Sequence, residues 1–97
     1  MKITFLGGGN MANALIGGMF KQGFAAADIT VIDPGSAARD KLERTYAVNC
    51  LETGEMLDNI GDLLVLAVKP QQMKDAVTPL VDKLGNAVVV SIAAGLD

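Results

Sequence analysis

The sequence predicts an α/β fold with a doubly wound parallel sheet, and three observations carry this prediction. Apolar, strand-like segments alternate with amphipathic, helix-like segments along the whole chain. A glycine-rich turn at residues 7–12 stands between the first strand and the first helix. An uninterrupted apolar run at residues 63–68 is typical of a parallel strand covered on both faces. Since parallel crossovers are right-handed, we expect a Rossmann-like sheet with strand order 3-2-1-4-5.

The first predicted helix follows a strand at residues 2–6. Its apolar and small residues recur at the spacing that predicts one buried helical face. That face consists of Met11, Ala14, Leu15, Gly18 and Met19. Gly17 and Gly18 each cost about 1 kcal/mol relative to alanine inside a helix, so they suggest close packing on the sheet. Gly23 is expected to end the helix.

The remaining elements continue this alternation. The predicted strands and helices span residues 28–33 (strand), 36–44 (polar-faced helix), 47–51 (strand), 53–59 (helical turn), 63–68 (strand) and 87–93 (strand). Apolar residues from Met73 to Leu84 predict another helix, which Pro79 should kink or divide. Because the last strand would leave an apolar edge bare, we expect residues 1–97 to be a domain truncated after its fifth strand, with a second domain missing.

The turn F-L-G-G-G-N-M-A fits the pattern of a dinucleotide-binding loop, because a strand precedes it, a helix follows it and Asp33 stands 24 residues after Gly9. Gly7 permits a tight turn, Gly9 lets a pyrophosphate approach the backbone, and Ala12 keeps the helix close to the sheet. The helix N-terminus attracts phosphate, and Asn10 is expected to cap it. A tight turn without a ligand is the alternative.

The composition is that of one globular domain. With 97 residues and 51% hydrophobic residues, the chain can bury a core. A net charge of −3 and the lack of a basic run argue against nucleic acid or an anionic membrane as partners. No apolar run has the length of a membrane span or a signal peptide, so we expect an untargeted cytoplasmic protein.

Metal, thiol and acid–base chemistry are disfavoured. The chain has no histidine and a single cysteine, so we expect no metal site and no internal disulfide. Cys50 is interpreted as a small apolar residue at a strand end rather than a reactive thiol. No general acid, nucleophile or oxyanion group stands out, and no catalytic residue is predicted.

Three motifs, in order along the chain, resemble those of pyrroline-5-carboxylate reductases, the enzymes of the last step of proline biosynthesis. They are F-L-G-G-G-N-M-A at residues 5–12, A-V-K-P at 67–70 and V-S-I-A-A-G at 90–95. Each stands at the carboxyl end of a predicted strand, where a doubly wound sheet binds its ligands. The resemblance implies an oxidoreductase that reduces 1-pyrroline-5-carboxylate to L-proline with NADPH or NADH.

The resemblance also implies a cofactor-binding set. Residues 8–12 would hold the pyrophosphate, residues 67–70 would pass beside the adenosine half, and residues 93–95 would lie near the nicotinamide ribose. With the acid of the second strand, the predicted set is Gly7, Gly8, Gly9, Asn10, Met11, Ala12, Asp33, Ala67, Val68, Lys69, Pro70, Ala93, Ala94 and Gly95.

In this family a C-terminal helical domain holds the substrate and forms the dimer, so the resemblance implies a homo-oligomer of which this chain supplies only the cofactor half. We expect the chain to bind cofactor without reducing the imine by itself. One alternative is another nicotinamide-dependent reductase, of the β-hydroxyacid dehydrogenase or deazaflavin-dependent type, against which the G-N-M-A turn argues. The other is a stand-alone dinucleotide-binding module.

The residues leave the choice between NADH and NADPH open. Asp33 can accept hydrogen bonds from both ribose hydroxyls of NADH and should repel a 2′-phosphate. Ser36 and Arg39 follow closely enough to contact such a phosphate if the turn at Pro34 and Gly35 directs them inward. Arg39 could equally be a solvated helix residue, and Asp33 a turn former before Pro34.

Overall fold

The computed structural model describes residues 1–92 and contains one five-stranded sheet, with its strands in the order β3-β2-β1-β4-β5. All four neighbouring pairs are parallel. The strands are β1 (Ile3–Leu6), β2 (Ile29–Ile32), β3 (Asn49–Leu51), β4 (Leu63–Leu66) and β5 (Val88–Ser91). The predicted α/β class, doubly wound topology and strand order are therefore confirmed.

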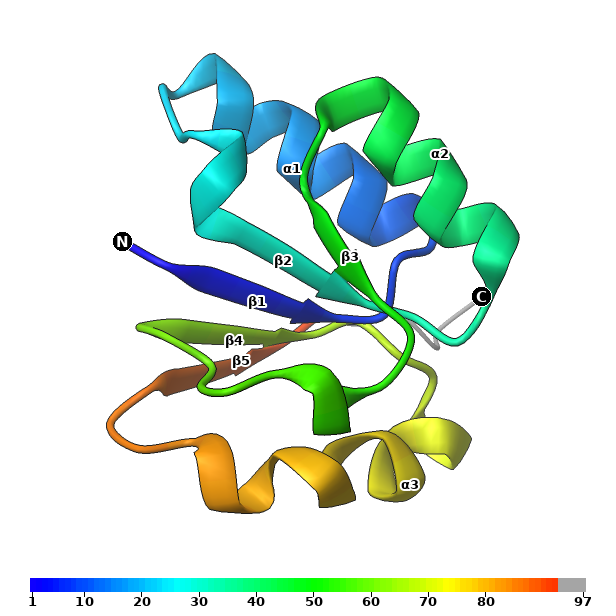
Figure 1. Cartoon of the computed structure of the whole chain (residues 1–97), viewed down its shortest axis with the longest axis vertical. Helices are drawn as coiled ribbons and strands as arrows, with labels where there is room; N and C mark the ends of the chain where they lie inside the picture. The colour runs from blue at the N-terminus through cyan, green and yellow to red at the C-terminus, as the bar shows by residue number, and fades with distance from the viewer. Residues whose placement is uncertain (93–97) are drawn as a thin grey trace.

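Helices cover the two faces of the sheet (Figure 1). The helices α1 (Asn10–Lys21) and α2 (Ser36–Tyr46) lie on one face, and α3 (Met73–Val77) lies on the other. Short 3-10 segments are η1 (Ala26–Asp28), η2 (Gly54–Met56), η3 (Pro70–Gln72) and η4 (Thr78–Lys83). Pro79 divides α3 from η4 as expected, because proline supplies no N–H for a helical hydrogen bond.

Alternate residues of the strands enter two separate cores. On the face of α1 and α2, the sheet buries Ile3, Phe5, Ile29, Val31 and Val65 against Ala12, Ile16 and Leu42. On the opposite face, Leu6, Ile32 and Leu64 pack with Ile60 and Leu80. The strand β4 contributes to both cores, which confirms the interpretation of its uninterrupted apolar run.

The predicted buried face of α1 is wrong, because the buried stripe begins at Ala12 and not at Met11. Ala12 and Ile16 are fully buried, whereas Met11 is 44% exposed and Leu15 41% exposed. Ala14 and Gly18 are also exposed, and Met19 is only partly buried. Nearly every residue from 11 to 20 is apolar or small, so spacing alone does not distinguish neighbouring stripes. Contact with the sheet decides which stripe is buried.

The glycines of α1 also differ from the prediction of close packing on the sheet. A Cβ atom at Gly17 would lie 2.7 Å from the hydroxyl oxygen of Tyr46 in α2, and one at Gly18 would meet no atom within 4 Å. Gly23 ends the helix as predicted, with φ +95°. Its N–H donates to Phe20 O, and the N–H of Phe24 donates to Met19 O.

Several strands are shorter than predicted. The third strand begins at Asn49 rather than residue 47, because α2 extends to Tyr46 and Ala47 adopts a left-handed conformation with φ +57° that ends the helix. The fifth strand ends at Ser91, and residue 93 of its predicted range lies outside the described residues. These differences leave the position of the glycine-rich turn unchanged.

Candidate cofactor-binding site

The glycine-rich turn leaves β1 at the point where the sheet changes direction. The strand β1 lies between β2 and β4, which the chain reaches in opposite senses from β1. The N–H of Gly7 donates to Ile32 O at 2.8 Å, and the N–H of Ala67 donates to Leu6 O at 2.8 Å. The carboxyl ends of β1, β2 and β4 therefore meet around the turn, at the switch point where doubly wound folds bind ligands.

Two glycines of the turn meet different needs. Gly7 has φ +105°, and a Cβ atom there would lie 2.7 Å from the carbonyl oxygen of Ala67. The expected role of Gly7 in a tight turn is thus confirmed by its geometry. A Cβ atom at Gly9 would have no atom of the described residues within 4 Å. Gly9 therefore faces open space, which is what the approach of a phosphate requires.

The N-terminus of α1 opens into the same space. Gly9 is the N-cap residue, and the N–H of Asn13 makes the first helical bond, to Gly9 O at 3.0 Å. The N–H groups of Asn10, Met11 and Ala12 have no acceptor within the helix, so they are available to an anion. The prediction that Asn10 caps the helix is wrong, because Asn10 is already its first residue and no described side chain caps this end.

Asp33 joins this turn to the next one. One carboxylate oxygen, Oδ2, accepts the N–H of Gly8 at 2.8 Å, and the other, Oδ1, accepts the N–H of Gly35 at 2.7 Å. Arg39 of α2 donates from Nη1 to the backbone carbonyl oxygen of Asp33 at 2.7 Å. Asp33 therefore forms the turn before Pro34, as one of its two hypotheses expects, and its carboxylate lies at the edge of the site.

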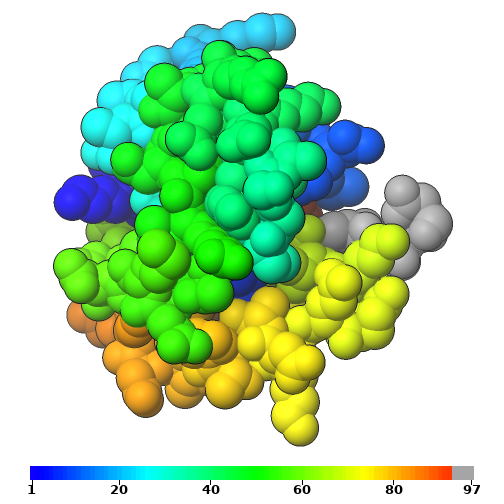
Figure 2. All heavy atoms as spheres, turned by 45° about the vertical axis from the view of Figure 1, so that its right-hand side comes forward, coloured from blue at the N-terminus to red at the C-terminus, as the bar shows by residue number. Residues whose placement is uncertain are grey.

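These elements enclose a hollow of about 650 Å³. In Figure 2 the blue of the first residues shows at the bottom of a recess between the start of α2 and the yellow segment of η3 and α3. The residues that line the hollow are Gly7, Gly8, Gly9, Asn10, Met11, Ala14, Asp33, Ala67, Val68, Lys69 and Gln72. The fold thus brings together residues from the glycine turn, the end of β2 and the A-V-K-P motif.

Not every predicted site residue borders the hollow. Ala12 is fully buried in the core behind the turn, where its small side chain fits the expected close approach of α1 to the sheet. Pro70 is exposed and lies outside the lining. The residues Ala93, Ala94 and Gly95 lie outside the described residues. Ala14 and Gln72 line the hollow but were not among the predicted site residues. They follow two predicted site residues, Met11 and Lys69, by three positions.

A second hollow, of about 400 Å³, adjoins the first and shares Val68 and Gln72 with it. Apolar side chains on its lining come from the carboxyl ends of the strands and from α3: Leu6, Ile32, Val68 and Ala76. Its acidic residues are Glu52, Glu55 and Asp75. This hollow was not predicted, because segments between residues 6 and 79 that carry no common motif meet there only in the folded chain.

The two hollows together fit a dinucleotide. The first offers unpaired backbone N–H groups and a glycine whose missing side chain leaves room for phosphate. The second offers apolar surface of the kind that a planar base covers. This fit follows from the shape of the two hollows and from the backbone N–H donors of this chain.

The comparisons with known proteins agree with this geometry. Residues 2–95 match the family described as "NADP oxidoreductase coenzyme F420-dependent". This chain belongs to that family. Two similar curated proteins are both named pyrroline-5-carboxylate reductase: one from Pseudomonas aeruginosa, 42% identical over 98% of this chain, and one from Vibrio alginolyticus, 38% identical over 99%. The chain spans about 35% of the length of the first relative and 36% of the second.

A solved structure confirms the fold of this family member. The crystal structure of Plasmodium falciparum pyrroline carboxylate reductase with NADP bound matches 95% of this chain with a TM-score of 0.75. The sequence identity is 22%, and the match covers 33% of that longer chain. The likeness supports the sheet topology described above.

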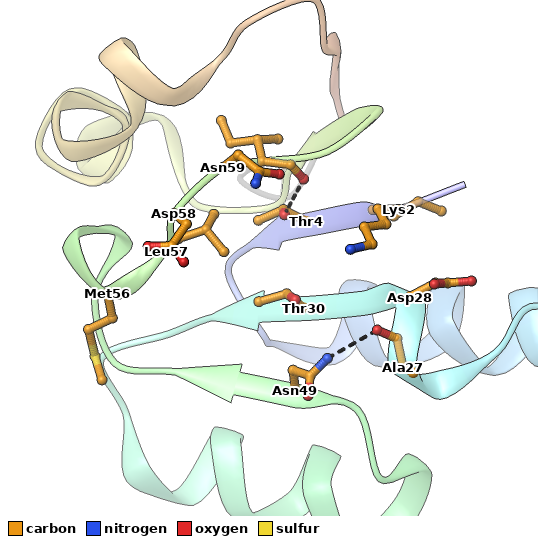
Figure 3. Close-up of a pocket in the computed structure, with 12 residues that line it drawn as sticks. Lys2, Thr4, Ala27, Asp28, Thr30, Asn49, Met56, Leu57, Asp58 and Asn59 are labelled. Atoms are coloured by element: carbon orange, nitrogen blue, oxygen red, sulfur yellow. Dashed lines mark hydrogen bonds between the residues drawn. The ribbon is translucent and has the colours of Figure 1, made fainter.

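A third hollow, of about 270 Å³, lies against the sheet face opposite α1 and α2, beside Thr4, Thr30 and Asn49 of β1, β2 and β3 (Figure 3). It adjoins the residues from Met56 to Ile60, which connect β3 to β4 without an α-helix. Two of its polar side chains are committed to the backbone. The hydroxyl of Thr4 donates to Ile60 O at 2.7 Å, and the amide of Asn49 donates to Ala27 O at 3.3 Å. These bonds support the fold, and they leave no reason to assign a ligand there.

Cys50 agrees with its interpretation as a packing residue. It lies half-buried in β3 against the core under α2. Burial, and then the negative charge of Glu43, raises the pKa of its thiol from 9.0 to about 11. The thiol is therefore protonated at neutral pH, which disfavours nucleophilic chemistry.

Residues 1–92 contain no group of three His, Cys, Asp or Glu side chains that could hold a metal ion. None of their helices combines the length and apolarity needed to cross a membrane.

Proposed function

We propose that the chain is the cofactor-binding part of a pyrroline-5-carboxylate reductase, which reduces 1-pyrroline-5-carboxylate to L-proline with NADH or NADPH. The observation that carries the proposal is the hollow at the switch point, where the glycine turn, Asp33 and the A-V-K-P segment meet. The names of the relatives supply the substrate. Because the chain spans about a third of those relatives, the reaction is proposed for the longer protein.

Each part of the site then has a binding role. The N–H groups at the start of α1 hold the pyrophosphate, and Gly9 leaves room for it. Asp33 accepts a ribose hydroxyl at the adenosine end, where the residues from Ala67 to Pro70 pass beside the cofactor. For the motif residues from Ala93 to Gly95, the proposed role is contact with the nicotinamide ribose. Small side chains suit these positions, because they let the backbone approach the cofactor.

The chemistry divides between the cofactor, this chain and a second domain. The reduced nicotinamide, when bound, supplies the hydride for the C=N carbon. The residues of this chain bind the cofactor and fix its orientation. The ionisable side chains bordering the described hollow are Asp33, whose carboxylate is committed to two backbone N–H groups, and Lys69. The groups that hold and protonate the imine therefore belong to a second domain, which also forms a homo-oligomer in the cytoplasm.

Calorimetric titration of the chain with NADH and with NADPH tests the cofactor part of this proposal. Saturable binding of either one supports it, and binding of neither by a chain that circular dichroism shows to be folded contradicts it. An assay of the longer protein with 1-pyrroline-5-carboxylate tests the substrate part. Cofactor binding without imine reduction by the longer protein would favour another reductase of this family.

A further inference from the structure

The carboxylate of Asp33 is fixed at the edge of the hollow. Its two oxygens accept the N–H groups of Gly8 and Gly35, at 2.8 and 2.7 Å. These donors belong to the turns after β1 and β2, so the carboxylate ties the two turns together. Moving the side chain aside would break both bonds and leave the part-buried N–H of Gly8 without its acceptor. A bound cofactor therefore meets this negative charge in place.

A carboxylate in a fixed position should affect the binding of NADH and of NADPH differently. Each oxygen of Asp33 retains capacity for a further hydrogen bond, so it can accept a ribose hydroxyl of NADH. The 2′-phosphate of NADPH is mainly a dianion at neutral pH and offers acceptors rather than donors. The N-terminus of α2 could attract such a phosphate, but the N–H of Gly35 at its N-cap already donates to Asp33, so a phosphate bound there would stand against the carboxylate.

The charges around the adjoining hollow act in the same direction. Glu52, Glu55 and Asp75 belong to its lining. The cations nearby are Lys69, which borders the first hollow, and Lys83, whose Nζ donates to Gly54 O and Glu55 O at 2.9 and 3.1 Å. Arg39 lies near Asp33, but one of its terminal nitrogens is committed to the carbonyl oxygen of Asp33 at 2.7 Å. The added charge of a 2′-phosphate would thus enter a region where carboxylates outnumber cations.

We propose that this site selects NADH over NADPH and that Asp33 is its specificity-determining residue. The inference rests on the proposed dinucleotide-binding function and adds the chemical class of cofactor that the site takes. It contrasts with the Plasmodium falciparum protein, whose structure contains NADP. In this chain a 2′-phosphate beside the end of β2 would meet the fixed carboxylate of Asp33.

Titration calorimetry of the chain and of Asp33→Asn with both cofactors tests the proposal. The chain should bind NADH at least about tenfold more tightly than NADPH, which corresponds to about 1.4 kcal/mol. Asn keeps the shape of Asp and one of the two acceptors, so the ratio should move toward NADPH by at least about fivefold. Asp40→Asn is the matched control, because Asp40 is exposed on α2 outside both hollows and its loss should leave the ratio unchanged.

A second variant keeps the proposal testable if Asp33→Asn does not fold. The double variant Glu52→Gln, Glu55→Gln removes two exposed charges from the adjoining hollow. It should raise the affinity for NADPH by several-fold and leave that for NADH nearly unchanged. Equal or tighter binding of NADPH by the unmodified chain would overturn the selectivity while leaving dinucleotide binding intact. Binding of neither cofactor would overturn the proposed function, and the selectivity with it.

Discussion

The hydroxyl oxygen of Tyr46 occupies the space beside Gly17, 2.7 Å from the point where a Cβ atom of residue 17 would stand. The hydroxyl lies within hydrogen-bond distance of two acceptors in α1, Asn13 O at 3.3 Å and Asn13 Oδ1 at 3.2 Å. The ring of Tyr46 packs edge-on against Phe20, with 5.2 Å between the centroids. The missing side chain of Gly17 therefore lets α1 and α2 meet.

Alanine at the two neighbouring glycines of α1 should have different effects on stability. Gly18→Ala should raise the free energy of unfolding by up to about 1 kcal/mol, because alanine favours the helix and its Cβ meets no atom. Gly17→Ala gains the same propensity but displaces Tyr46, so it should be at least about 1 kcal/mol less stable than Gly18→Ala. Urea denaturation measures both.

Tyr46→Phe provides the control for this pair. Without the hydroxyl, Gly17→Ala should become stabilising in the double variant. If Gly17→Ala and Gly18→Ala have equal effects in both backgrounds, the contact between Tyr46 and Gly17 has no energetic role.

Local patterns predicted the sheet and the turn well. The apolar run of β4, the glycine turn after β1 and the stop at Gly23 each depend on a few adjacent residues, and each lies where it was expected. Because parallel crossovers have one hand, those elements also determined the strand order. The position of the hollow at the glycine turn followed from the same information, since the carboxyl ends of β1, β2 and β4 must meet.

Contacts between distant segments were harder to predict. The buried stripe of α1 depends on which side of the helix meets the sheet, and a helix with Met11, Ala12, Leu15 and Ile16 offers two stripes of similar apolarity. Glu52, Glu55 and Asp75 come from separate segments and line the adjoining hollow together. Nothing in the sequence around these acids distinguishes them from acids that simply face solvent. The negative charge of this hollow therefore follows only from the folded structure.

The thiol of Cys50 should react slowly in the folded chain. With a pKa of about 11 instead of 9.0, its thiolate fraction at pH 8 falls by about 100-fold. Labelling with iodoacetamide, followed by mass spectrometry, should be slower by about that factor in the folded chain than in urea. Similar labelling rates in the two states would show that the thiol is not protected.

The same raised pKa of Cys50 links stability to alkaline pH. Below pH 9 the thiol is protonated in both the folded and the unfolded state, so the contribution of Cys50 to the free energy of unfolding is fully present. As the pH rises from 9 toward 11, the unfolded thiol ionises first and this contribution is lost. Cys50→Ala should therefore lose less stability over this range than the unmodified chain. Parallel pH profiles of the two would contradict the prediction.

An apolar surface beside β5 should drive self-association of the chain. The register pairs Val88 with Leu63 and Val90 with Val65, so both valines lie on the sheet face that α1 covers, and they are 61% and 42% exposed. Asn13 and Gly17 face α2, which places Leu15 on the flank of α1 away from α2. These exposed side chains border β5, the edge strand of the sheet that residues 1–92 form.

Light scattering after size exclusion measures this association. Leu15→Lys with Val90→Lys should reduce the apparent mass, because charges on an edge disfavour pairing. Met56→Lys replaces another exposed apolar residue, outside this surface, and should have no effect. A monomer of the unmodified chain at high concentration would contradict the expectation.

Two glycines of the cofactor turn should separate folding from binding. Gly7→Ala should destabilise the chain, because a residue with φ +105° favours glycine and the new Cβ would meet Ala67 O at 2.7 Å. Gly9→Ala should fold with little loss of stability, since the φ of Gly9, −78°, suits alanine and no described atom lies within 4 Å of its Cβ. It should nevertheless weaken NADH binding by at least about tenfold, because the methyl group enters the space that the pyrophosphate needs. Thermal unfolding and calorimetric titration of both variants make the comparison. If Gly9→Ala bound NADH as tightly as the unmodified chain, the pyrophosphate would not lie against the N-terminus of α1.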